Sequence, residues 1–212
     1  MTRRHIGRDN LRKRLAPGEG APGRTTYADA IVRIEPDDGE CLEIRPSFGL
    51  AHEAEYDRVR AAPLLEEIAA DHVVAALLVR LGGYAVGVFE GERLVASKVG
   101  SRFVKNRHKK GGSSANRFRR RREEQVADLV REAAEVAALV LEPWRARAEF
   151  AALGGDRTAV DAVLVARPDL GWLRERALPR FFTVAEPRQR VLEAFPYDLY
   201  AVEVVTLSPD EP

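Results

Sequence analysis

Cysteine, histidine and aromatic residues are scarce in this 212-residue chain. Cys41 is the single cysteine, which excludes an intramolecular disulfide framework and a cysteine-rich metal site. The histidines show no metal-ligand spacing, so we expect no metal and no cofactor; they are His5, His52, His72 and His108. No stretch approaches the roughly 18 uncharged apolar residues of a membrane span, and the N-terminus lacks the apolar core of a signal peptide. We therefore expect a cytoplasmic protein with no membrane partner.

The chain also lacks net charge, because its formal charge is only +1. Between Arg102 and Arg122, however, there are ten Lys or Arg residues and no Asp or Glu. Acidic residues elsewhere must balance this run. Basic charge that is segregated in this way usually marks a polyanionic partner. The Gly111–Gly112 pair breaks the run in two and is predicted to lie at a loop tip just before a helix, where backbone can approach a ligand closely.

From composition alone, two interpretations of this segment stay open. It is either an ordinary Gly-Gly linker followed by a solvated helix face, or a surface that binds RNA. If it binds RNA, the predicted contacts come from nine basic side chains: Arg102, Lys105, Arg107, Lys109, Lys110, Arg117, Arg119, Arg120 and Arg121.

Residues 1–71 precede the main domain. Residues 1–24 are basic, poor in apolar residues and rich in Pro and Gly at their end, which predicts a disordered arm, either inert or in contact with RNA. A helical turn over Asn10–Leu15 is compatible with the sequence. Residues 25–71 are expected to form a small appendage, with a hairpin around the turn at 36–39 and a short amphipathic helix or linker after it.

Residues 72–212 are predicted to form an α/β domain with a mixed sheet and helices on its faces. The apolar run at 73–81 suits a strand that is covered on both faces, and two further strands complete a three-strand meander. Apolar residues then recur at helical spacing from Val126 to Leu141, so a long helix is expected from about Ala115 to Leu141. The remaining segments predict a strand, a helix capped by Asp156, a short helix, a strand at 180–187, a helix and a last strand.

Arginines occupy the first turns of the predicted long helix. Because the helix dipole disfavours cations at an N-terminus, each such residue costs a few tenths of a kcal/mol, roughly. Contact with phosphate groups would offset that cost, which favours the RNA-binding interpretation.

The segment GGSSANRFRRRR resembles the Gly-Gly-Gln loop and following helix in the middle domain of eukaryotic and archaeal class 1 peptide release factors. The matching positions are Gly111, Gly112, Ser114, Ala115, Arg117, Phe118, Arg120 and Arg122. Upstream, LVRLGGYAVGVFEGERLVASKVGSR resembles the bacterial branch of that superfamily, the Vms-like release factors of actinobacteria. The resemblance covers about Val73 to Leu207 and implies a ribonuclease-H-like middle domain.

The resemblance also implies partners and a reaction. Relatives insert the loop into the peptidyl-transferase centre and promote attack of water on the ester that joins nascent peptide to tRNA. The implied partners are the large ribosomal subunit and peptidyl-tRNA, with no DNA, and the protein is expected to be a monomer. The implied function is codon-independent peptidyl-tRNA hydrolysis in ribosome rescue or quality control, since the sequence has no stop-codon-reading domain of the size that class 1 factors have.

One position departs from the family pattern. Ser113 stands where class 1 factors carry the catalytic Gln, and Ala115 stands where the bacterial members carry it. The predicted catalytic loop residues are therefore Gly111, Gly112, Ser113, Ala115 and Asn116, with Asn116 able to lend an amide. Three hypotheses follow: a hydrolase with altered loop chemistry, a ribosome or tRNA binder without hydrolysis, and a general RNA-binding protein.

Overall fold

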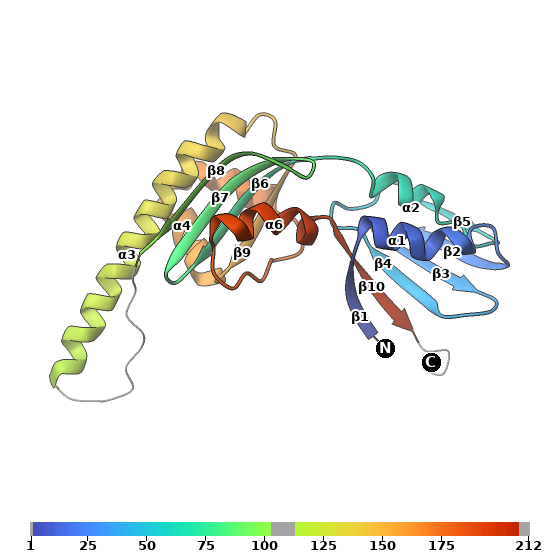
Figure 1. The fold of residues 1–212 in the computed structure, drawn as a ribbon, viewed down its shortest axis with the longest axis horizontal. Coiled ribbons are helices and arrows are strands. Elements are labelled where there is room, and N and C mark those ends of the chain that lie inside the picture. Colours follow the sequence, from blue (N-terminus) through green and yellow to red (C-terminus); the bar gives the residue numbers. More distant parts are fainter. Residues whose placement is uncertain (1, 103–112, 208–212) are drawn as a thin grey trace. The chain divides into compact units, whose positions relative to one another are not determined.

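The computed structural model describes residues 2–102 and 113–207. The chain divides into two compact units, one made of residues 1–71 and 197–212, the other of residues 72–196. In the part that the structure describes, the first unit carries a six-stranded sheet and the second a four-stranded sheet, each packed with helices (Figure 1). The predicted mixed α/β fold class is confirmed.

The sheet of the second unit begins with the predicted meander. Strands β6 (Val73–Arg80), β7 (Gly83–Glu90) and β8 (Arg93–Ser101) pair antiparallel in sequence, and β9 (Phe150–Gly155) then pairs parallel to β6. The sheet order is β8-β7-β6-β9.

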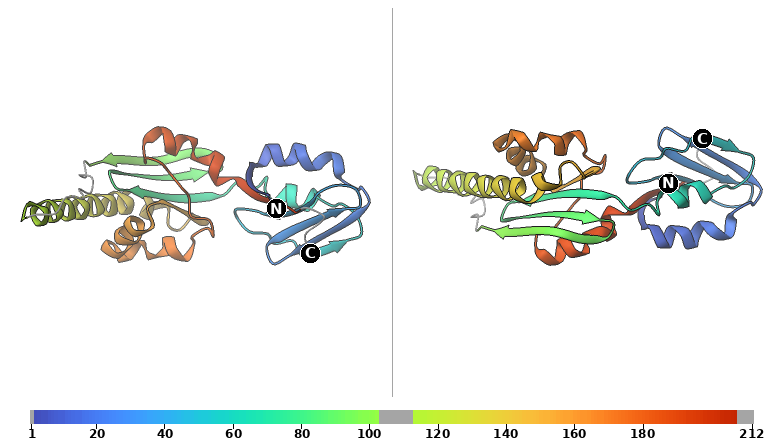
Figure 2. Two further views of the ribbon diagram at one scale, coloured as in Figure 1. Left: turned by 90° about the horizontal axis from the view of Figure 1, so that it is seen from below. Right: turned by 90° about the horizontal axis from the view of Figure 1, so that it is seen from above.

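Helices cover both faces of this sheet, which is why its central strands are apolar throughout. On one face, α3 (Ser113–Leu141) and α4 (Arg157–Ala166) form a core with alternate residues of β6 and β7. On the other face, α6 (Gln189–Leu199) places Phe195 against Phe89, with ring centroids 5.9 Å apart. Figure 2 shows α6 and the α3–α4 pair on opposite sides of the sheet. The predicted cap of α4 is confirmed, since the Asp156 carboxylate accepts a hydrogen bond from the Ala159 N–H at 3.0 Å.

The strand predicted at 180–187 is wrong, because in that range only Phe182 pairs with a strand. A short helix, α5 (Trp172–Glu175), is followed by chain that meets β9 only at two isolated parallel bridges, Ala151 with Ala177 and Gly154 with Phe182. Pro179 lies between the two bridging positions. Because proline has no N–H to donate to a ladder, continuous pairing is interrupted there.

The first unit is an antiparallel sheet in the order β1-β10-β4-β3-β2-β5. Its strands are β1 (Thr2–Gly7), β2 (Gly23–Ala28), β3 (Ile31–Pro36), β4 (Cys41–Arg45), β5 (Ala54–Tyr56) and β10 (Ala201–Leu207). The predicted hairpin is confirmed as β3 and β4, which pair antiparallel. Inward-facing residues of the sheet pack on α1 (Arg8–Leu15) and α2 (Ala62–Glu67). The last strand, β10, belongs to this unit, whereas we predicted it within the domain at 72–212. The predicted hairpin appendage is therefore part of a larger sheet.

The arm predicted to be disordered over residues 1–24 is a folded part of this unit. Residues 2–7 form β1, which pairs with β10, and residues 8–15 form α1. Leu11 and Leu15 are buried against the sheet. Composition indicated disorder because so few apolar residues lie here; two leucines at helical spacing suffice, since the rest of the core comes from distant strands.

Candidate nucleic-acid interface

Helix α3 extends beyond the sheet on which its C-terminal half packs (Figure 1). Leu129 is the first buried residue among the described side chains of the helix. The preceding part of α3, from Ser113 to Asp128, would be about 24 Å long at 1.5 Å per residue. The predicted long helix is confirmed, and it begins at Ser113 rather than Ala115.

The described arginines of this extension differ in their ion-pair partners. Arg119 lies 3.7 Å from Glu123 and Arg120 lies 3.3 Å from Glu124, both at i,i+4 spacing. Among the described residues, Arg117 and Arg121 have no ion-pair partner. Four exposed arginines thus lie in the second and third turns of α3, and no acidic residue occupies its first turn. Asn116 is also exposed.

Arg102, the last described residue of the preceding segment, is engaged within the protein. Its backbone N–H donates to the Gly82 carbonyl at 3.0 Å, which continues the pairing of β7 with β8. Its guanidinium lies 2.9 Å from an Asp128 carboxylate oxygen and 3.5 Å from a Glu132 oxygen, both on α3. Arg102, which charge alone predicted as an RNA contact, therefore links a strand end to the helix.

Tyr84 on β7 completes this link. Its hydroxyl donates to Glu132 Oε1 at 3.0 Å, although its side chain is almost fully buried. Burial, together with the hydrogen bond to the Glu132 carboxylate, raises the pKa of Tyr84 to about 12. Tyr84 therefore stays protonated and acts as a hydrogen-bond donor at neutral pH. We call Arg102, Tyr84, Asp128 and Glu132 the clamp.

The remaining predicted site residues are only partly within the described structure. Gly111, Gly112, Lys105, Arg107, Lys109 and Lys110 lie outside the described residues. The backbone of Ser113 and Ala115 lies in the first turn of α3. The N–H groups of a first helical turn have no partner within the helix and point toward its N-terminal end.

The acidic residues and the tyrosine of this region were missed by sequence reasoning. Glu123 and Glu124 could have been found, because glutamates four residues after arginines form pairs on a helix. Asp128 and Glu132 share one helical face by the same spacing rule. The contact between Tyr84 and Glu132 could not have been found from the sequence, because it depends on the pairing register of β7 and on how α3 packs.

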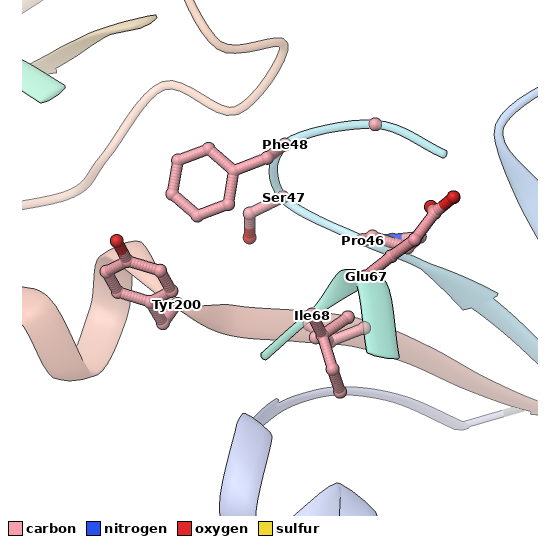
Figure 3. A pocket seen from close by; sticks show the side chains of 8 residues that line it. Pro46, Ser47, Phe48, Glu67, Ile68 and Tyr200 are labelled. Atoms are coloured by element: carbon pink, nitrogen blue, oxygen red, sulfur yellow. The ribbon is translucent and has the colours of Figure 1, made fainter. Parts of the chain in front are cut away.

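Other kinds of site receive little support in the described part of the chain. No group of three or more His, Cys, Asp or Glu residues there is arranged to hold a metal ion. None of the helices searched is both long enough and apolar enough to cross a membrane. A cavity of about 20 Å³ lies in the first unit between Phe48, Glu67, Ile68 and Tyr200 (Figure 3). That volume suits about one water molecule and is too small for a substrate.

Two solved structures are similar to this chain. The crystal structure of the archaeal translation termination factor aRF1 matches with a TM-score of 0.45 and 18% identity, covering 82% of this chain and 51% of that one. The chain thus spans about half the length of that factor. Dom34 of S. cerevisiae, described as a translation termination-like factor involved in RNA quality control pathways and interacting with Hbs1, matches with a TM-score of 0.31 and 6% identity, covering 89% and 62%.

No curated protein matches the chain. A family model does, however, and it covers residues 72–205, which include the whole second unit and the candidate interface. By this match the chain belongs to the Actinobacteria/chloroflexi VLRF1 release factor family.

Proposed function

We propose that this protein is a ribosome-associated peptidyl-tRNA hydrolase that acts in the cytoplasm, without reading a codon, in ribosome rescue or quality control. Membership of a release-factor family supports this function. The observation that carries it is the extension of α3, which presents four exposed arginines within its second and third turns, away from the buried part of the helix. Positive charge gathered in this way suits the phosphates of RNA.

The proposed chemistry is acyl transfer to water. The ester carbonyl acquires negative charge as water attacks, and backbone N–H groups aimed at that oxygen would stabilise it. The first turn of α3 supplies such groups through Ser113 and Ala115 whatever their side chains are. No side-chain nucleophile is required, so Ser113 need not form a covalent intermediate. Asn116 would supply the amide that positions water.

A second function, binding without hydrolysis, is favoured by one specific observation. Ser113 and Ala115 occupy both positions at which the release factors that this sequence resembles carry Gln. A factor that binds the ribosome or tRNA would keep the basic extension and lose the group that positions water. A general RNA-binding role is a third candidate, which family membership makes less favourable.

The deciding experiment is peptide release from peptidyl-tRNA bound to isolated large ribosomal subunits. Release by the purified protein would support the hydrolase, and release there would need no codon. Co-sedimentation with the subunits but no release would favour the binder. If the protein neither binds the subunits nor releases peptide, both proposals are contradicted and the general RNA-binding role remains.

Arg117→Glu with Arg121→Glu serves as the matched variant in that assay. It reverses the two arginines that have no partner among the described residues and keeps the Arg119–Glu123 and Arg120–Glu124 pairs. We expect ribosome association to be lost and the melting temperature to be maintained, because both side chains are exposed and make no ion pair among the described residues.

Arg12→Glu with Lys13→Glu on α1 is the charge-matched control, and it tests the RNA-contacting role considered for residues 1–24. Both residues are exposed near a helix C-terminus, where the dipole already accounts for them. We therefore expect this variant to retain ribosome association.

A further inference from the structure

The clamp lies at the point where α3 leaves the body of its unit. Asp128 and Glu132 flank Leu129, the first buried residue of the helix among those described. C-terminal to this point the helix is held by its apolar face in the core. N-terminal to it, the described side chains are exposed or half-buried. The direction of the extension is thus set near Asp128.

The clamp contacts the helix at two positions about one turn apart. Asp128 and Glu132 are four residues apart, so their carboxylates lie on one face about 6 Å from each other along the axis. One guanidinium, from Arg102 at the end of β8, contacts both. Such a two-point contact resists rotation of the helix about its axis as well as tilting, which a single ion pair does not.

A second strand reinforces the same face. Tyr84 and Gly100 are directly paired in the β7–β8 register, and the tyrosine ring crosses over Gly100 toward α3. A Cβ atom on Gly100 would lie 2.3 Å from the ring, closer than real atoms approach. A glycine on the neighbouring strand therefore provides the space through which the Tyr84 hydroxyl reaches Glu132.

We propose that Arg102 is a positioning residue, which with Asp128, Glu132 and Tyr84 fixes the direction of the α3 extension and so the placement of its N-terminal turn on the RNA. The role in catalysis rests on the proposed function; the role in fixing the helix does not. Since about 22 Å of helix separates Asp128 from Ser113, a tilt of about 10° would move the first turn by about 4 Å. Displacement of a catalytic group by about 1 Å can already cost 10²-fold in rate.

The chain offers a matched control for Arg102. Arg131 lies 3.1 Å from the same Asp128 carboxylate, but both residues belong to α3, so their pair makes no link to the sheet. Arg102→Ala and Arg131→Ala each remove one positive charge beside Asp128. Only the first removes the link. Arg102→Lys keeps the charge, and a single ammonium cannot reproduce the planar contact with two carboxylates.

A distance measurement tests the clamp without reference to activity. Spin labels would be placed on cysteines introduced by Glu123→Cys on the extension and Lys98→Cys on β8, in a Cys41→Ser background; both label sites are exposed. We expect a narrow distance distribution in the parent and in Arg131→Ala, a broadened one in Arg102→Ala, and an intermediate one in Arg102→Lys. A distribution that Arg102→Ala leaves unchanged would overturn the proposal.

Peptide-release kinetics test the catalytic consequence. We expect Arg102→Ala to lower the rate at saturating protein by about 10-fold or more, with little change in the concentration needed for half-saturation. If the variant instead weakens binding and reduces the salt dependence by about one phosphate contact, with its distance distribution unchanged, Arg102 touches RNA directly and the proposal is wrong. If no form of the protein releases peptide, the proposed hydrolase function fails while the distance result still decides the clamp.

Discussion

The guanidinium of Arg102 lies 2.9 Å from the carboxylate of Asp128, so the last residue of a basic strand end is bound to the helix that carries the rest of the basic run. Arg119 and Arg120 are also paired, through Glu123 and Glu124. The arginines of this region therefore differ in whether a carboxylate already neutralises their charge. Arg117 and Arg121 have no ion-pair partner among the described residues. Arg102, Arg119 and Arg120 would each have to share or give up a carboxylate partner to bind a phosphate.

Removing the acidic partners should strengthen RNA binding. Glu123→Gln with Glu124→Gln releases Arg119 and Arg120, and we expect tighter binding with a salt dependence steeper by about 0.7 to 0.9 for each additional phosphate that is bound. Helix stability should fall by only about 0.3 to 0.5 kcal/mol per pair, because the pairs are exposed. RNA affinity measured over a series of salt concentrations checks this. Glu53→Gln with Glu55→Gln removes the same negative charge from the first unit, and an equal rise in affinity there would show that only overall charge matters.

The sequence was sufficient for the elements whose evidence is local. The meander, the length of α3 and the Asp156 cap follow from periodicity, turn residues and capping preference, all of which act within a few positions. Phosphate-binding candidates were likewise visible as a run of arginines. These predictions needed no knowledge of how distant segments pack.

Non-local contacts account for the errors in the first unit and in the basic segment. The strand β1 exists because it pairs with β10, which lies at the other end of the sequence, and composition alone indicated disorder there. The same limit hid the clamp, because a carboxylate such as Glu132 appears in the sequence as one more solvated acid on a helix. Arg102 was consequently predicted as an RNA contact, and its two carboxylate partners came only with the structure.

Gly100 should be intolerant of a side chain. Gly100→Ala places its Cβ against the Tyr84 ring, so we expect a loss of about 1 to 3 kcal/mol in the free energy of unfolding. In a Tyr84→Ala background the same change should cost much less, because the obstructing ring is gone. Denaturant unfolding of the two single variants and the double variant measures the coupling. Gly171→Ala, where a Cβ meets nothing within 4 Å, is the control; additive costs at Gly100 and Tyr84 would contradict the packing described.

The ionisation of Tyr84 should weaken the fold at alkaline pH. Its pKa is raised from 10.0 to about 12 by burial and by Glu132, so the protonated hydroxyl is favoured in the folded state. The resulting stabilisation is fully present below pH 10 and is lost as pH rises from about 10 through 12. Spectrophotometric titration of tyrosinate should show a late step that Tyr84→Phe removes. A Tyr84→Phe protein with the same late absorbance change and the same alkaline unfolding profile would contradict this assignment; Tyr27, also raised to about 12, accounts for a second late step.

Peptide release should be slowed by the absence of a glutamine amide that positions water. Because Ser113 and Ala115 replace Gln, intrinsic release should be slower than in a Gln-bearing relative, by about 10² to 10³, while ribosome binding stays similar. Ser113→Gln or Ala115→Gln should raise the release rate, since the backbone N–H groups of the first turn of α3 are unaffected by either change. Single-turnover release from peptidyl-tRNA on large subunits measures both effects. Asn116→Ala is the companion variant: if the natural protein already matches its Gln-bearing relative and Asn116→Ala abolishes release, Asn116 supplies the amide and the predicted deficit is wrong. If the natural protein and both Gln variants bind the subunits but release nothing, the hydrolase proposal gives way to the binder.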